Sequence, residues 1–352
     1  MEQVTLPLQL SRWLNVVGSG STSDQISIGM SAAVAVPRRL RVGIVNNMPD
    51  AAIKRTENQF STLLQAASGC LPLSIEYYSL PDIPRTDDMQ QRLAASYTPL
   101  CELWNNRPDA IIITGTEPRQ RYLTDEVYWA SFAQLIDWID RTGIPAFYSC
   151  LAAHAAVWRL EGVDRVPLHR KCFGIFDHEV AAEHSLMDGV GLHMTLPHTR
   201  WNDVPEAALA RAGYEVLSWS PDAGVGFFSR RGANVQLFCQ GHPEYDSKNL
   251  LREYRRDVSR FLTGEQSIYP NLPQSYFDES EAWQLNAFKQ QALAQPGAAG
   301  IDTFPTVRKE REGSDWEAPA VRIFSNWLRY AAMIAEPRQI ADLSQGRTGK
   351  AG

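Results

Sequence analysis

The sequence contains few cysteines, no metal-binding spacing and no long apolar run. Its 352 residues include five cysteines without a CxxC pair, and none of its seven histidines stands in an HxxxH or HExxH pattern, so we assign no metal. No apolar stretch approaches the roughly 20 residues that span a bilayer, so no membrane partner is expected. The 34 Lys and Arg are outnumbered by 40 Asp and Glu, for a net charge of −6. This balance argues against nucleic acid as a partner.

The composition that remains is that of a soluble globular protein, with 44% apolar and 21% charged residues. The length allows one large α/β domain or two smaller ones. The first residues, MEQVTLPLQLSRWL, lack the basic and apolar segments of a secretory signal. Together with the scattered cysteines, this predicts a cytoplasmic protein in which one thiol is reactive and the other cysteines are small core residues.

Three regions differ in composition. Residues 1–38 are predicted to form an N-terminal extension, because they include the flexible-linker segment GSGSTS. Residues 39–335 carry the pattern of a folded domain, and 336–352 are predicted to form a polar C-terminal tail. A stretch rich in Pro, Gly and charge at 296–315 is expected to be a loop before a last amphipathic helix at 318–335.

Strand-like and helix-like segments alternate from residue 41 onwards. The segment AIIITG, a nearly continuous apolar run that ends in Gly, is typical of a strand covered on both faces. The alternation predicts an α/β fold with a mostly parallel sheet and helices on both faces. After Trp201, short turns divide β-type runs, which predicts antiparallel or mixed additions. The expected strands are 41–46, 73–80, 110–115, 145–149, 214–220, 225–230 and 234–240, and the expected helices are 54–68, 127–143, 150–160 and 246–262.

Cys150 stands where a predicted buried strand, AFYS, turns into an Ala-rich helix. A sharp strand-to-helix turn raises its side chain at the carboxyl edge of the sheet, where open α/β sheets bind ligands. A helix N-terminus lowers a thiol pKa, and the backbone N–H of Leu151 can donate to an oxyanion. The alternative is a buried core cysteine, and the spacing alone does not decide between the two.

His242 and Glu244 offer the base that such a thiol requires and a carboxylate that orients the base. They lie in GHPEYD after the predicted strand NVQLFCQ, where Pro243 favours an extended backbone with both side chains on one side. An isolated HPE is more often a surface turn, but a cysteine at another strand end favours a joint site. The other histidines are weaker candidates, among them His154 one turn into the helix after Cys150, and His178 and His198 in loops or at strand ends.

Ten motifs follow one another along the chain: RVGIVNNMP (41–49), TENQF (56–60), AIIITGTEP (110–118), VYWASFAQLIDW (127–138), KCFGIFDH (171–178), LPHTRW (196–201), GHPEYD (241–246), LREYRRD (251–257), YF (276–277) and FSNWLRY (324–330). Taken in order, these motifs resemble the homoserine O-acyltransferases of methionine synthesis (succinyltransferases or acetyltransferases). The similarity runs from about residue 40 to 335 and identifies 39–335 as an acyltransferase domain. It implies a class I glutamine amidotransferase-like fold with a flavodoxin-like core.

The resemblance implies a ping-pong acyl transfer. Cys150 matches the nucleophile that attacks the thioester of an acyl-CoA, His242 matches the general base, and Glu244 matches the partner of that base. Backbone N–H groups of Leu151 and of the turn at Thr116 are expected to stabilise the oxyanion. The acyl-CoA is a co-substrate, and no bound cofactor is expected. The acceptor implied is the hydroxyl of homoserine or of a similar hydroxy-amino acid.

Three residues match the substrate pocket of these acyltransferases. Arg256 matches the arginine that holds the α-carboxylate of the amino acid, and Lys171 and Thr199 match positions where the family usually has Lys and Ser. From the residues alone, Arg252 and Arg256 could equally form a solvated helix face, and Lys171 a strand-edge charge. A homodimer is implied by the resemblance alone.

The chain departs from the family pattern at several positions. Asn46 and Asn47 stand where an Asn-Leu pair usually precedes MP, His154 stands where Gln is frequent, and residues 1–38 have no expected counterpart. Arg119 falls where Gly or Glu tends to separate succinyl from acetyl donors. An arginine beside the acyl pocket favours a donor with a terminal carboxylate, so we predict succinyl over acetyl transfer.

Other functions remain open on the same residues. A glutamine amidotransferase-type hydrolase would use the same Cys150, His242 and Glu244, although the strand-to-helix turn around Cys150 lacks a G-x-C-x-G pattern. Another acceptor, such as serine, would keep the mechanism and change only the pocket. A non-catalytic binding protein on this scaffold is disfavoured, because the three residues are all present.

Overall fold

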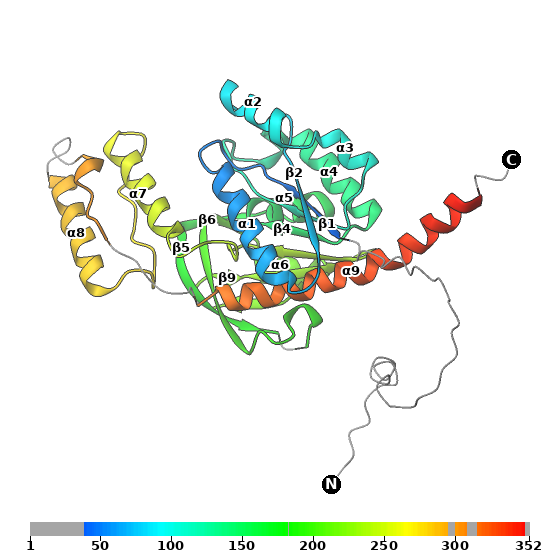
Figure 1. Cartoon of the computed structure of the whole chain (residues 1–352). Helices are drawn as coiled ribbons and strands as arrows, with labels where there is room; N and C mark the ends of the chain where they lie inside the picture. The colour runs from blue at the N-terminus through cyan, green and yellow to red at the C-terminus, as the bar shows by residue number, and fades with distance from the viewer. Residues whose placement is uncertain (1–38, 182, 295–299, 308–314, 349–352) are drawn as a thin grey trace, which may run out of the picture. The chain divides into compact units, whose positions relative to one another are not determined.

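The computed structural model describes residues 39–181, 183–294, 300–307 and 315–348 (Figure 1). The predicted N-terminal extension, residues 1–38, and parts of the predicted loop 296–315 lie outside the described residues. The described chain has the predicted α/β class, and its strands form two sheets.

The larger sheet has seven strands in the order β2-β1-β3-β4-β11-β10-β7. The strands from β2 to β11 pair in parallel, whereas β10 and β7 are added antiparallel. This order places β3, β4 and β11 side by side, so that their carboxyl ends share one edge of the sheet. The strands are β1 (Leu40–Val45), β2 (Leu73–Tyr78), β3 (Ala110–Ile113), β4 (Ala146–Ser149), β7 (Glu215–Val216), β10 (Phe227–Arg231) and β11 (Val235–Cys239).

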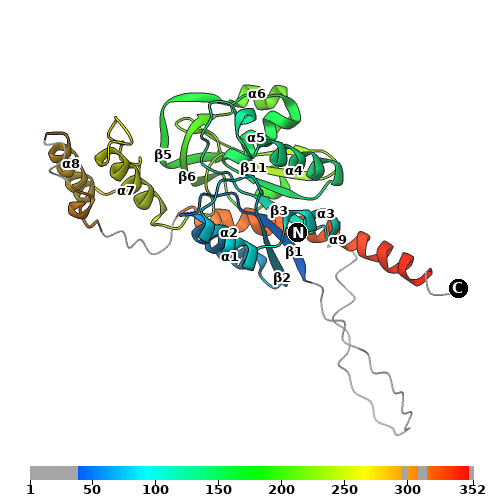
Figure 2. The same cartoon turned by 90° about the horizontal axis from the view of Figure 1, so that it is seen from above.

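Helices cover both faces of this sheet, because its central strands are apolar on both sides. Along β3, Ile111 and Ile113 belong to a core shared with α4 and α5, while Ala110 and Ile112 belong to a core shared with α1 and α9. Figure 2 shows α4 and α5 on one side of the sheet and α1 and α9 on the other. The helices are α1 (Ile53–Ser68), α4 (Trp129–Thr142), α5 (Leu151–Glu161) and α9 (Glu317–Thr348).

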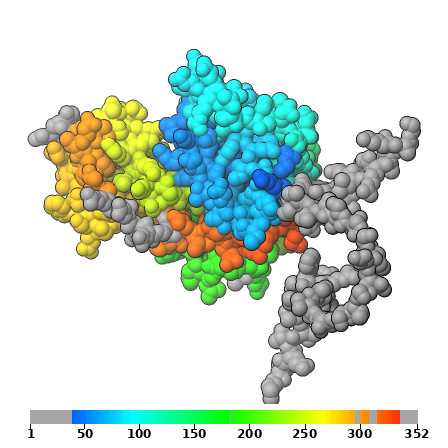
Figure 3. Space-filling view, in the orientation of Figure 1, coloured from blue at the N-terminus to red at the C-terminus, as the bar shows by residue number. Residues whose placement is uncertain are grey.

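The smaller sheet is antiparallel and has the order β6-β5-β8-β9. Its long strands β5 (Val166–Val180) and β6 (His193–Asp203) are paired over most of their length, and the short β8 (Ser218–Ser220) and β9 (Gly224–Val225) complete it. Phe173 and Ile175 of β5 share a third core with helices α7 (Asn249–Leu262) and α8 (Glu279–Ala294). The space-filling view shows α7, in yellow-green, beside the blue surface of the residues that follow β1 (Figure 3).

The structure adds elements that the sequence pattern did not indicate. The β5–β6 pair and α8 were not predicted, nor were the short helices α2 (Asp87–Ser96), α3 (Leu100–Asn105) and α6 (Glu206–Arg211) and the 3-10 turns η1 (Leu123–Asp125), η2 (Ser185–Met187) and η3 (Ile301–Thr303). No residue of α2 is buried, so it has no apolar stripe for a periodicity argument to find.

The last helix is also longer than expected. Its backbone continues to Thr348, into the predicted tail 336–352, whereas we expected it to end at Ala335. Within the described residues, no helix has both the length and the apolar character needed to cross a bilayer.

Candidate active site

Cys150 lies in a strained turn at the carboxyl end of β4. Its backbone has φ 51° and ψ −112°, a positive φ that residues other than glycine rarely adopt. The N–H of Cys150 donates to the carbonyl oxygen of Cys239, at the end of the neighbouring β11, at 2.7 Å. Helix α5 begins at the next residue, Leu151. The turn therefore holds a partly buried thiol at the sheet edge and at the start of a helix.

His242 and Glu244 follow β11, the strand next to that of the thiol. Nδ1 of His242 lies 2.9 Å from Oε1 of Glu244, and the two residues are only 8% and 9% exposed. The His242 side chain also hydrogen-bonds to Cys150. Because Nδ1 is occupied by Glu244, the nitrogen that faces the sulfur is Nε2. The structure thus brings these three side chains into one contiguous group.

The pKa of His242 is raised well above that of a free imidazole. Burial acts to lower it, but the charges of Cys150 and Glu244, and the hydrogen bonds to both, act in the opposite direction and prevail. The protonated form of His242 is therefore stabilised by the two side chains on either side of it. A thiolate is the nucleophilic form of cysteine, so this electrostatic arrangement favours attack by sulfur.

The turn after β3 packs directly against the start of α5. A Cβ on Gly115 would lie 2.7 Å from Cβ of Leu151 and 3.0 Å from its backbone N, so the close approach depends on glycine. It places the Gly115–Thr116 turn beside the first amides of α5, which have no partner within the helix. Asn47, one of the departures from the family pattern, holds this turn: its side chain donates to the carbonyl of Thr114 at 3.2 Å, and its N–H donates to Thr114 Oγ1 at 2.8 Å.

Lys171, Thr199 and Arg256 converge on two carboxylates of α7 that the sequence analysis missed. Nζ of Lys171 donates to Oδ2 of Asp257 at 2.7 Å, and Oγ1 of Thr199 donates to Oε2 of Glu253 at 2.5 Å. Arg256 donates through Nε and Nη2 to Oδ1 of Asp257, at 2.9 and 2.8 Å. Glu253 and Asp257 are one helical turn apart, and this spacing within EYRRD is the signal that could have indicated a shared face.

The charges in this cluster stabilise one another. Burial acts to raise the pKa of Asp257, but Lys171 and Arg256 lower it overall. The pKa of Arg256 is raised, because Asp257 and Glu253 outweigh the effect of burial. The Arg256 side chain is still 46% exposed. One face of the guanidinium is therefore accessible to a carboxylate of a ligand.

Tyr245 connects this cluster to the Cys–His–Glu group. Its ring stacks on that of His242, with centroids 4.3 Å apart, and its hydroxyl donates to Oε1 of Glu253. A continuous path of contacts thus runs from Cys150 through His242 and Tyr245 to Glu253. The two groups form one site rather than two.

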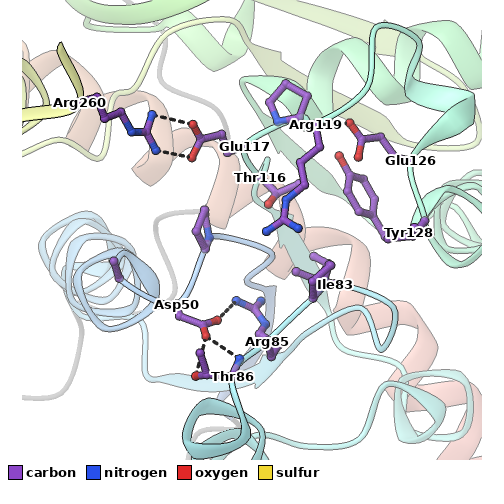
Figure 4. A pocket seen from close by; sticks show the side chains of 15 residues that line it. Asp50, Ile83, Arg85, Thr86, Thr116, Glu117, Arg119, Glu126, Tyr128 and Arg260 are labelled. Atoms are coloured by element: carbon purple, nitrogen blue, oxygen red, sulfur yellow. Dashed lines mark hydrogen bonds and ion pairs between the residues drawn. The ribbon is translucent and has the colours of Figure 1, made fainter. Parts of the chain in front are cut away.

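Arg119 lies on a different side of the site, beside the Gly115–Thr116 turn that packs against the start of α5. With Thr116 it lines a cavity of about 640 Å³ at the carboxyl ends of β1, β2 and β3 (Figure 4). Its backbone N–H donates to Oε1 of Glu126 at 2.6 Å, but its side chain makes no hydrogen bond or ion pair with any described residue. The other two arginines of the cavity are paired, Arg85 with Asp50 and Arg260 with Glu117.

Two of the histidines outside the site, His178 and His198, are buried within strands rather than in loops or at strand ends, contrary to our expectation. His178 and His198 lie within β5 and β6, both fully buried, with their Nε2 atoms 3.3 Å apart. His154 is also buried, with Nε2 2.9 Å from Oε1 of Gln240. It therefore links the helix that follows Cys150 to the segment that precedes His242.

The positions of the cysteines differ from our expectation that all but the reactive one lie in the core. Cys172 and Cys239 are buried, but Cys70 and Cys101 are exposed rather than in the core. Nowhere in the described chain do three or more His, Cys, Asp or Glu side chains gather as ligands for a metal ion.

Comparison with known proteins identifies the family to which this site belongs. The homoserine O-succinyltransferase family model matches residues 24–338. The chain belongs to the homoserine O-succinyltransferase family. A relative named homoserine O-succinyltransferase from Rhodopseudomonas palustris is 40% identical over 304 residues, which are 86% of this chain and 91% of the relative. A relative of the same name from Methylorubrum extorquens is 39% identical over 309 residues, 86% of this chain and 92% of the relative.

The family match confirms the resemblance seen in the sequence, and with it the expectation of an enzyme of this family. It begins at residue 24, so the last part of the segment 1–38, for which we expected no counterpart, lies within the family model. Solved structures are more distant. Glutamine amidotransferases from Thermotoga maritima (13% identical, covering 74% of this chain and 100% of that chain, TM-score 0.43) and Methylobacillus flagellatus (12%, 83% and 94%, TM-score 0.45) carry no information about the reaction of the family.

Proposed function

We propose that the protein transfers a succinyl group from succinyl-CoA to the hydroxyl of L-homoserine, through a thioester on Cys150, in methionine biosynthesis. The observation that carries this proposal is the contact of Cys150 with His242, and of His242 with Glu244, at the edge of the parallel sheet. The names of the relatives support succinyl as the acyl group and homoserine as the acceptor.

The first half-reaction forms the acyl-enzyme. The Cys150 thiolate attacks the thioester carbonyl, and the electron pair moves to the carbonyl oxygen. The N–H of Leu151 and the Gly115–Thr116 turn stabilise this oxyanion, and one such donor lowers the barrier by about 3 kcal/mol. The intermediate then expels CoA as a thiolate, which takes the proton of the His242 imidazolium. The products are CoA thiol, a succinyl thioester on Cys150 and a neutral imidazole.

Acylation prepares His242 for the second half-reaction. The thioester is uncharged, so one of the charges that raise the pKa of His242 is lost and the imidazole becomes an effective base. Nε2 takes the proton of the homoserine hydroxyl while the oxygen attacks the thioester carbonyl. Collapse of the intermediate expels the Cys150 thiolate and releases the O-succinyl product. The thiolate–imidazolium pair of the free enzyme is restored.

The cluster on α7 suits a zwitterionic acceptor. Arg256 presents the exposed face of its guanidinium to an α-carboxylate, and Glu253 presents a carboxylate oxygen to an α-ammonium group. Because Tyr245 joins Glu253 to His242, the acceptor bound here has its side chain on the side of the base. Serine, whose side chain is one carbon shorter, would place its hydroxyl farther from Nε2.

The decisive experiment is mass spectrometry of the full chain after incubation with succinyl-CoA alone. We expect one succinyl group on the peptide that contains Cys150, no adduct in Cys150→Ala, and loss of the adduct with formation of O-succinylhomoserine when homoserine is added. An adduct on another residue would contradict the assignment of the nucleophile. Glutamine hydrolysis without any acyl adduct would favour an amidotransferase-type hydrolase instead.

Assembly and location stay predictions. The family resemblance implies a homodimer in the cytoplasm, and sedimentation of the purified chain would measure its oligomeric state.

A further inference from the structure

Among the buried side-chain atoms that have no hydrogen-bond partner within the described part of the chain, two belong to Arg165 and Tyr128, which lie close to each other. They are Nη1 of Arg165, between α5 and β5, and the hydroxyl of Tyr128, just before α4. Buried donors are nearly always paired in proteins, because an unpaired one costs free energy. Two such donors close to one another therefore point to a partner that enters with a ligand.

Tyr128 faces the cavity that holds Arg119. The tyrosine is 3% exposed and lines that cavity together with Thr116, as Figure 4 shows. Burial raises the pKa of Tyr128, and Glu126 adds to this, while the positive charges of Arg165 and Arg119 act to lower it. The phenol hydroxyl therefore lies within the field of two guanidinium groups.

Arg165 lies close to the nucleophile as well as to Tyr128. Burial lowers the pKa of its guanidinium, while Tyr128, Glu126 and Cys150 act to raise it. Its Nη2 donates to the backbone carbonyl of Arg121 at 3.2 Å. Nη2 of the guanidinium is thus held by the loop that follows Arg119, whereas Nη1 is buried and has no hydrogen-bond partner among the described residues.

The charged groups that act on Tyr128 comprise one more positive than negative charge. Arg85 and Arg260 are paired with Asp50 and Glu117, as described above. Of the charged groups that act on Tyr128, Arg119 and Arg165 are positive, and only Glu126 is negative. Both backbone amides that follow Pro118, those of Arg119 and Gln120, donate to one oxygen of Glu126. The surroundings of Tyr128 therefore suit a ligand group with a single negative charge.

We propose that Arg165 and Tyr128 form the subsite for the distal carboxylate of the succinyl group, with Arg119 on the cavity side of it. The inference rests on the proposed function and names the residues that select the donor. The carboxylate of a succinyl thioester lies three carbon–carbon bonds, about 4 Å, from the reacting carbonyl. Its receptor must therefore lie within reach of Cys150, and Arg165 is close enough to Cys150 for their charges to interact. Carboxylates are bound most strongly by arginine, and a phenol hydroxyl adds a second donor.

The test compares succinyl-CoA with butyryl-CoA, in which a methyl group replaces the carboxylate. For each enzyme, kcat/KM is measured for both donors at saturating homoserine, and their ratio is the readout. Because both donors are assayed on the same preparation, partial misfolding cancels from this ratio. In Arg165→Met we expect the ratio to fall about a hundredfold, the loss typical of a buried charged pair. In Tyr128→Phe, which removes one oxygen atom only, we expect a fall of about tenfold.

Arg159→Met is the matched control. Arg159 lies on α5, is partly exposed and pairs with Asp137, so its loss should leave the ratio within about twofold of the wild type. A ratio that is unchanged in Arg165→Met and in Tyr128→Phe would overturn the subsite. So would a wild type that forms the Cys150 adduct as readily from butyryl-CoA as from succinyl-CoA. A wild type that forms no adduct from any thioester would instead refute the proposed function.

Discussion

Tyr245 stacks its ring on that of His242, with centroids 4.3 Å and planes 19° apart, and donates its hydroxyl to Glu253. One side chain thus supports both the base and the carboxylate of the acceptor cluster. The stacking contact acts on the position of the imidazole, whereas the hydroxyl acts on Glu253. Substitutions that remove one contact or both therefore have different kinetic consequences.

Tyr245→Phe keeps the ring and removes the hydroxyl. We expect KM for homoserine to rise about tenfold with little change in kcat, because Glu253 loses one of its two hydroxyl donors. Tyr245→Leu also removes the stacked ring, so kcat should fall as well. Steady-state kinetics at saturating succinyl-CoA measure both parameters. Equal losses of kcat in the two variants would show that the hydroxyl, and not the ring, positions His242.

Arg256→Lys tests the recognition of the acceptor carboxylate. Lysine keeps the charge but loses the planar fork, so KM for homoserine should rise about tenfold or more while kcat changes little. Arg252→Lys is the control, because Arg252 lies one turn away on α7 and pairs with Asp246. A similar rise in KM in both variants would mean that the general positive charge of α7, rather than Arg256, attracts the acceptor.

Gly115→Ala tests the oxyanion turn. The added Cβ would lie 2.7 Å from Cβ of Leu151, so the Gly115–Thr116 turn must move away from the start of α5. We expect kcat to fall about tenfold to a hundredfold, since the donors then no longer fit the oxyanion. Gly300→Ala is the matched control, because a Cβ there meets nothing closer than 4.0 Å and φ is negative. Normal kcat in Gly115→Ala would remove the turn from the mechanism.

The central sheet could be predicted from the sequence because its signals are local. β3, β4 and β11 are short apolar runs; Cys150 directly follows β4, and His242 comes three residues after the end of β11. Parallel strands place their carboxyl ends at one edge, so it was possible to bring the two residues together without coordinates. The signal that identifies such a buried strand lies in a few consecutive apolar residues and the turns that flank them.

The acceptor cluster and the carboxylate subsite could not be predicted in the same way. Lys171 meets Asp257 across 86 positions, through the packing of α7 on the unpredicted β5. Arg165 and Tyr128 are ordinary residues in sequence, and only their buried, unpaired atoms single them out. Such contacts depend on how separate elements pack, which no local pattern encodes. The four-residue spacing of Glu253 and Asp257 indicates a shared helix face but not what that face contacts.

The buried His154 makes the stability of the protein depend on pH. Burial lowers its pKa to about 3, whereas an unfolded histidine titrates near 6.5. Between these values the unfolded chain binds a proton that the folded chain does not, so the free energy of unfolding falls as the pH drops below about 6.5. His178, whose pKa burial lowers to about 4, contributes in the same direction.

His154→Gln isolates the contribution of this one residue. Glutamine does not titrate, and its amide can donate to Oε1 of Gln240 as Nε2 of His154 does. Urea unfolding at pH 7, 6 and 5 should show a shallower loss of stability in the variant, with the difference approaching about 1.4 kcal/mol per pH unit at the acid end. His169→Gln, at an exposed position, should follow the wild-type curve. Parallel curves for His154→Gln and the wild type would mean that His154 accepts a proton in the folded protein, which the burial between α5 and Gln240 should prevent.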